Sequence, residues 1–157
     1  MDTTSQSYTV QSMLTMGAKC LKLSGDMQPE ARDQAVLAFR QVHAKILIAT
    51  DVIARGFDVS TVTLVVNYDL PVDIHTGGAA FDTYLHRIGR SGRFGRKGAA
   101  FNFVNTGQHS RKHMPDVDVI EEISRYFKRD IPAIPADDEE AFIRVLEDAG
   151  LAEQEDA

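Results

Sequence analysis

Four arginines recur at every third position within ten residues, and this spacing is the strongest chemical signal in the sequence. They are Arg87, Arg90, Arg93 and Arg96, and glycines at positions 89, 92 and 95 alternate with them. Like charges this close repel one another, and each glycine weakens a helix by roughly 1 kcal/mol. Arginine binds phosphate oxygens through paired hydrogen bonds, so a phosphate ligand would offset the repulsion. The segment therefore predicts a phosphate site in preference to a solvated basic face.

A second polar group follows a short apolar run at residues 46–49. Its members are Thr50, Asp51, Arg55, Gly56 and Asp58. In an open parallel sheet, ligands bind beyond the carboxyl ends of the strands, and a hydroxyl, a guanidinium and a glycine suit an anionic ligand. The same residues could instead cap the turn into a short helix. From this segment alone the two interpretations stay open.

The elements that would position these groups follow from the pattern of apolar residues. Strands are expected at residues 19–23, 45–49, 61–67 and 99–104, and helices at 5–16, 29–42, from near 82, 117–128 and 138–148. The runs at 45–49 and 61–67 are mainly apolar and rich in β-branched residues, which predicts strands buried on both faces. Short strands that alternate with helices predict an α/β fold with an open parallel sheet.

Composition and charge favour one intracellular domain. The 157 residues, 43% of them hydrophobic, are enough for a single domain over 1–157. The net charge is −6, but residues 137–157 hold nine carboxylates and one base, which leaves +2 for the rest. We interpret 149–157 as a solvated acidic tail. The lone Cys20 excludes an internal disulfide and is expected in the core.

The sequence predicts neither a membrane segment nor a metal site. No apolar run is long enough to cross a bilayer, so a cytoplasmic or nuclear location is expected. His109 and His113 are spaced to share a helical face, but no third ligand of the usual kind stands near them.

Two of these segments together resemble the late motifs of superfamily 2 helicases, specifically those of DEAD-box RNA helicases. They read IATDVIARGFDV at 48–59 and YLHRIGRSGRFG at 84–95. LSGD at 23–26, followed by Arg32 and by FR at 39–40, and NYDLP at 67–71 stand in the family's order. From about residue 2 to residue 148 the chain resembles the second, C-terminal RecA-like domain of that family.

The resemblance implies roles around a nucleotide for five residues. Arg90 and Arg93 would be arginine fingers that reach the γ-phosphate of ATP across a cleft between two domains. Asp58 would accept a hydrogen bond from the ribose of that nucleotide. His86 and Arg87 would couple the cleft to the acidic box of the partner domain.

The resemblance also implies an RNA surface. Thr50, Arg55 and Gly56 would hold RNA phosphates, and Gly25 and Arg32 would extend that surface along the strand. Such contacts read backbone and sugar, so little sequence preference is expected.

The sequence departs from a complete helicase in three places. It contains no GxxxxGK[ST] phosphate loop and no Asp-Glu-Ala-Asp run. We therefore expect ATP and its Mg²⁺ to be held by an N-terminal RecA-like domain, and we expect this chain alone not to hydrolyse ATP. The chain starts just after the place of the family's first strand. Either it is a truncated fragment whose sheet lacks that strand, or another segment fills the place. Pro29 stands where the family usually has glutamine, which weakens one expected RNA contact.

A narrower resemblance points to the mRNA-export branch of the family. It rests on the loop at 71–82, on FDTYLHRIGRSGRFGRKG at 81–98 and on PADD at 135–138. The implied partners are RNA, a nucleoporin and an activator bound to inositol hexakisphosphate, at the cytoplasmic face of the nuclear pore, in ribonucleoprotein remodelling. The alternative is a stand-alone RNA- or protein-binding adaptor with the same fold and no catalysis, whose RNA binding would be indifferent to nucleotide. A dinucleotide-dependent enzyme is disfavoured, because no GxGxxG follows a strand.

Overall fold

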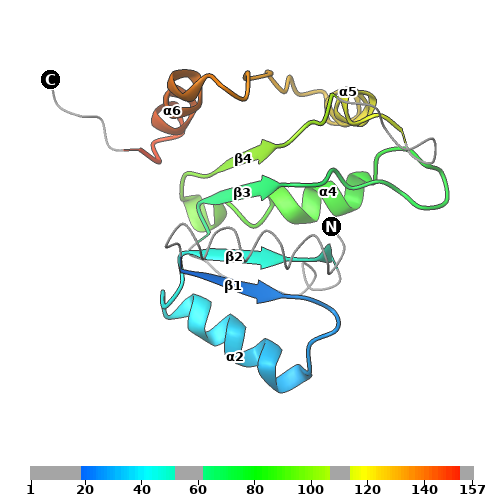
Figure 1. Ribbon diagram of the computed structural model, residues 1–157. Coiled ribbons are helices and arrows are strands. Elements are labelled where there is room, and N and C mark those ends of the chain that lie inside the picture. Colours follow the sequence, from blue (N-terminus) through cyan, green and yellow to red (C-terminus); the bar gives the residue numbers. More distant parts are fainter. Residues whose placement is uncertain (1–18, 52–61, 107–113, 153–157) are drawn as a thin grey trace, which may run out of the picture. The chain divides into compact units, whose positions relative to one another are not determined.

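A computed structural model describes residues 19–51, 62–106 and 114–152. The chain divides into two compact units, Met1–Thr61 and Val62–Ala157, which are described separately below (Figure 1). The helix expected at 5–16 lies outside the described residues.

The first unit is a parallel strand pair joined by one helix. Its elements are β1 (Cys20–Leu23), α2 (Pro29–Arg40) and β2 (Ile46–Ala49). The strands pair from Cys20 with Ile46 to Leu23 with Ala49, and α2 lies alongside β1 (Figure 1). Pro29 suits the first turn of α2, where its missing N–H has no partner to lose. The helix stops at Arg40, and Val42 has a left-handed φ of 59°.

The second unit repeats the strand–helix–strand order and adds two helices. Its elements are β3 (Leu64–Asn67), α4 (Phe81–Ile88), a short 3₁₀ helix η1 (Arg93–Gly95), β4 (Ala99–Asn102), α5 (Asp116–Phe127) and α6 (Glu139–Asp148). Strands β3 and β4 are parallel and pair from Leu64 with Ala99 to Asn67 with Asn102. The predicted fold class, parallel strands flanked by helices, is confirmed. The single domain over 1–157 and the acidic tail at 149–157 stay predictions.

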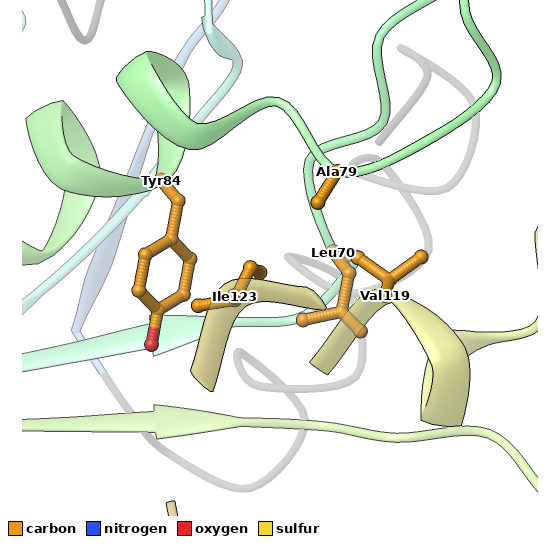
Figure 2. Packing of buried hydrophobic residues seen from close by; sticks show 5 residues of the cluster. All are labelled: Leu70, Ala79, Tyr84, Val119 and Ile123. Carbon is orange, nitrogen blue, oxygen red and sulfur yellow. The ribbon is translucent and has the colours of Figure 1, made fainter. Parts of the chain in front are cut away.

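One apolar cluster fixes α4 and α5 against the segment that follows β3. Figure 2 shows its five buried members, which are Leu70, Ala79, Tyr84, Val119 and Ile123. Val119 and Ile123 lie one turn apart on α5, and both are fully buried. Helix α6 has no buried residue, but Phe142 on it packs against Phe101 of β4, with 4.6 Å between ring centroids.

The predicted burial of two strands on both faces was wrong. In β2 only Ile48 is buried, and in β3 Leu64 and Val66 are 38% and 47% exposed. Within the described residues each sheet has two strands. Alternate side chains of a strand point to opposite faces, and the face of β3 that carries Asn67 meets α4. Leu64 and Val66 therefore lie on the opposite face.

The structure also bears on the expectations for Cys20 and for a membrane segment. Cys20, expected in the core, is half-buried. In the part of the chain that is described, no helix is long and apolar enough to span a membrane.

Candidate functional site

The arginine segment begins at the C-terminal end of α4. A glycine is required at position 89, because a Cβ there would lie 2.9 Å from the Leu85 carbonyl oxygen. Arg90 Nε donates to the His86 carbonyl at 3.1 Å, and Arg93 Nε donates to the Gly89 carbonyl at 2.8 Å. The carbonyls at a helix C-terminus carry partial negative charge and attract cations. These bonds therefore orient both guanidinium groups at the end of the helix.

A tight backbone turn then carries the arginines toward β4. Gly92, Phe94 and Gly95 all have left-handed backbones, with φ of 69°, 58° and 74°. Gly98 packs against the turn so closely that a Cβ on it would lie 2.3 Å from the Gly92 nitrogen. The glycines that interrupt the arginines thus allow a turn that few other residues could form.

The Arg87 side chain contacts the carboxyl end of β3. Its Nη1 donates to Asn67 Oδ1 at 3.2 Å and to the Asp69 carbonyl at 2.7 Å. The side chain is half-buried. Arg87 therefore connects α4 to the strand end where ligands bind in parallel sheets.

Asn67 continues this connection into a polar chain that the sequence did not reveal. Asn67 Nδ2 donates to Asn102 Oδ1 at 2.9 Å, and Asn102 Nδ2 donates to the Tyr84 hydroxyl at 3.3 Å. Asn67 is 2% exposed and Tyr84 is 5% exposed. The signal in the sequence was an asparagine at the end of an otherwise apolar run, within the NYDLP motif.

The first unit has its own polar group at the carboxyl end of β1 and β2. The Thr50 amide donates to the Leu23 carbonyl at 3.1 Å, which extends the strand pairing by one residue. Arg32, in the first turn of α2, donates from Nη2 to the Met27 carbonyl at 3.2 Å. Thr50 Oγ1 and Arg32 Nε are both buried, and within the described residues neither has a hydrogen-bond partner. Buried polar atoms are nearly always paired, so an additional partner is expected for each.

The turn between β1 and α2 presents an anionic side chain beside this group. The buried Ser24 hydroxyl donates to Asp26 Oδ1, and this bond holds the pKa of Asp26 below its usual range. Gly25 lies between them and is exposed.

A known protein family matches the part of the chain that carries these motifs. Residues 2–95 match the family described as Helicase conserved C-terminal domain. The chain belongs to this family. The ATP-dependent RNA helicase dbp5 of Schizosaccharomyces pombe is 46% identical over 127 residues, which are 81% of this chain and 24% of that protein. The helicase domain spans about a quarter of the length of the curated relatives that it matches.

Solved structures agree with this assignment. The S. cerevisiae Dbp5 bound to RNA and ADP BeF3 is 36% identical, with a TM-score of 0.81 over 96% of this chain and 37% of that one. The S. cerevisiae Dbp5 L327V bound to Nup159, Gle1 H337R, IP6 and ADP is 33% identical, with a TM-score of 0.77 over 94% of this chain and 36% of that one. The resemblance to DEAD-box helicases, and within them to the mRNA-export branch, is confirmed.

Within the helicase domain, the predicted site residues fall into three sets. Arg87 lies in the last turn of α4, Arg90 and Arg93 bond to carbonyls at the end of that helix, and His86 is exposed on it. Gly25, Arg32 and Thr50 lie together at the carboxyl end of β1 and β2. Arg55, Gly56 and Asp58 lie outside the described residues.

Residues 19–51, 62–106 and 114–152 contain no group of three or more His, Cys, Asp or Glu that could hold a metal ion. The oriented guanidinium groups of Arg90 and Arg93 have the chemistry that phosphate oxygens need.

Proposed function

We propose that this helicase domain is the C-terminal half of an ATP-dependent RNA helicase. In that enzyme it binds the RNA backbone and supplies Arg90 and Arg93 to ATP bound on an N-terminal RecA-like domain. The observation that carries the proposal is a pair of bonds at the C-terminal end of α4. Arg90 Nε donates to the carbonyl of His86 in the last turn, and Arg93 Nε donates to the carbonyl of Gly89, the C-cap. The bonds fix each guanidinium plane before a ligand arrives.

Fixed guanidinium groups suit the chemistry of phosphoryl transfer. Negative charge on the oxygens around the γ-phosphorus is rearranged in the transition state, and catalysis is largely positioning and electrostatic stabilisation. An arginine finger contributes about 10³ to 10⁵ in kcat. Because Arg90 and Arg93 are held by backbone carbonyls, they need little reorganisation when the charge develops. Mg²⁺ belongs to the N-terminal domain in this proposal.

The RNA surface is assigned to the polar group of the first unit. Thr50 and Arg32 are half-buried, and Thr50 Oγ1 and Arg32 Nε have no hydrogen-bond partner within the described residues. A small local rearrangement that uncovers these two atoms would let RNA phosphates satisfy both. Exposed Gly25 allows close approach of a backbone. Arg55 and Gly56 complete this surface in the proposal. Contacts of this kind fix position and carry no base specificity.

Three further residues have supporting roles in the proposal. Asp58 accepts a hydrogen bond from the ribose of the nucleotide. His86 and Arg87 couple the cleft to the acidic box of the N-terminal domain. Arg87 is half-buried and bonds to the end of β3 and to the Asp69 carbonyl just after it, which supports a role in coupling the two domains.

The proposed partners are inferred from the relatives described above. They are RNA, the N-terminal RecA-like domain, a nucleoporin and an activator that carries inositol hexakisphosphate. The location would then be cytoplasmic and nuclear, including the cytoplasmic face of the nuclear pore, and the process mRNA export or ribonucleoprotein remodelling. The Dbp5 structure that contains Nup159, Gle1 and IP6 supports this choice.

The test is to join this chain through a flexible linker to an N-terminal RecA-like helicase domain and to measure ATP turnover. Turnover is expected only in the joined protein, and RNA is expected to raise it. Neither half alone should hydrolyse ATP. If the joined protein shows no ATP turnover and its RNA affinity does not change with nucleotide, the chain is instead an adaptor.

A further inference from the structure

We propose that Asn67, Asn102 and Tyr84 are positioning residues that hold Arg87 in its working orientation. The inference rests on the proposed function, because it assumes that Arg87 couples two domains. It assigns a purpose to a partly buried series of hydrogen-bonded side chains to which none of the sequence motifs gives a role.

The chain of hydrogen bonds has one direction. Arg87 Nη1 donates to Asn67 Oδ1, Asn67 Nδ2 donates to Asn102 Oδ1, and Asn102 Nδ2 donates to the Tyr84 hydroxyl. A reversed Asn67 amide would turn its NH₂ toward the guanidinium, and two donors would face each other. Arg87 and Asn102 therefore together determine which end of the Asn67 amide faces the arginine.

The chain also returns to the helix from which it starts. Tyr84 and Arg87 are three residues apart on α4, on neighbouring positions of the helix surface. Asn67 and Asn102 are register partners at the carboxyl ends of β3 and β4. The side chains thus link α4 to β3, β3 to β4, and β4 back to α4. A closed loop of this kind resists rotation of the helix over the sheet.

Burial gives the loop its rigidity. Asn67 is 2% exposed and Tyr84 is 5% exposed, so an amide or hydroxyl that lost its partner there would lose water as well. A buried polar group without a partner is strongly unfavourable, which makes the fully bonded arrangement the preferred one. The 2.7 Å bond from Arg87 to the Asp69 carbonyl also ties the guanidinium group to the backbone in the same orientation.

The experiment compares two substitutions of Asn67 in the joined two-domain protein. Asn67→Leu keeps the approximate size and removes the acceptor for Arg87. Asn67→Asp keeps an oxygen toward Arg87, and Asn102 can turn its amide to donate to the second oxygen while Tyr84 donates to Asn102. We expect the leucine to lower kcat on the order of tenfold with KM for ATP and RNA affinity nearly unchanged. We expect the aspartate to restore most of that loss.

Graded substitutions and a separate control decide the outcome. Tyr84→Phe, the mildest change, should fold and lower kcat by about twofold, since its hydroxyl is two side chains away from Arg87. The proposal is overturned by unchanged kcat in Asn67→Leu, or by equal losses in the leucine and aspartate variants. If Asn67→Leu fails to fold, an unchanged kcat in Tyr84→Phe overturns it. Arg90→Ala in the same protein tests the proposed function independently, because full turnover there would refute that function whatever Asn67 does.

Discussion

At the scale of single residues, substitution of Thr50 can distinguish a structural role of its hydroxyl from a role in RNA binding. Its hydroxyl is buried without a partner within the described residues, which costs stability in the absence of a ligand. Thr50→Val removes the hydroxyl and nearly keeps the shape. We predict that the free energy of unfolding of the chain stays the same or rises by about 1 kcal/mol, whereas RNA affinity falls severalfold. Urea unfolding and RNA titration by fluorescence anisotropy measure the two effects.

Thr76 provides the matched control for this substitution. Its hydroxyl accepts a hydrogen bond from the Gly78 amide at 3.3 Å in an exposed loop. Thr76→Val should lower the free energy of unfolding by about 0.5–1.5 kcal/mol and leave RNA affinity unchanged. If Thr50→Val destabilises the chain as much and RNA affinity holds, Thr50 has only a structural role.

Single residues also show which parts of the site could be predicted from the sequence. The spacing of Arg90 and Arg93 was sufficient to predict a phosphate site, because repeated positive charge beside glycine is destabilising unless an anion neutralises it. Asn67 was not assigned a role, because its amide partner Asn102 lies 35 residues away. That contact exists only once β3 and β4 pair, and no local pattern predicts the register of two parallel strands.

At the scale of elements, two glycines of the arginine turn should differ sharply. At Gly98 a Cβ would lie 2.3 Å from the Gly92 nitrogen, whereas at Gly95 nothing lies within 4 Å and only its φ of 74° disfavours a side chain. Gly95→Ala is therefore expected to cost about 1–2 kcal/mol of stability. Gly98→Ala should cost more, because backbone must move, and it should lower ATP turnover of the joined protein well beyond the effect of Gly95→Ala. Equal effects on turnover would show that the packing of the turn does not matter.

The loop after β3 has a pH dependence that can be assigned to Asp73. Its carboxylate accepts from the Thr76 and His75 amides at 2.9 and 2.8 Å, and these bonds hold the pKa of Asp73 below its usual range. A lowered pKa means that the stabilisation is present above the pKa of the unfolded chain. It is lost as the pH falls through the lower pKa of the folded state. We predict by NMR that the Asp73 carboxyl titrates below ordinary aspartates and that the two amides shift with it.

Asp73→Asn is the control for this titration. The asparagine keeps an oxygen acceptor for both amides and cannot titrate in the acidic range. The amides of residues 75 and 76 should then lose their acid transition. A transition that persists in the variant would assign it to another group.

The sequence was sufficient to predict whether a segment forms a strand or a helix, but it was less informative about which faces of that element are buried. Mainly apolar runs correctly predicted β2 and β3, and Pro29 correctly placed the start of α2. The same runs did not predict which faces are covered, because burial depends on the neighbours that tertiary structure brings. Leu64 and Val66 are apolar by sequence and substantially exposed in the structure.

At the scale of the whole molecule, charge distribution matters more than net charge. The chain carries −6 overall, but the excess of acid lies in residues 137–157. Two cationic side chains, Arg32 and Arg55, are proposed to contact RNA phosphates. For single-stranded RNA, two such contacts predict that log K falls with log salt concentration with a slope of about −1.4. Anisotropy titrations at several salt concentrations measure this slope, and binding that is independent of salt would refute the proposed mode.

The most direct measurement is the ATP turnover of Arg90→Ala in the joined two-domain protein, with Arg96→Ala as the matched control from the same arginine run. Arg96 is exposed and has no proposed contact with the nucleotide. The account predicts that Arg90→Ala lowers RNA-stimulated kcat by about 10³-fold or more while RNA affinity holds, and that Arg96→Ala keeps kcat near the unsubstituted value. Unchanged turnover in Arg90→Ala, or an equal loss in both variants, would contradict it.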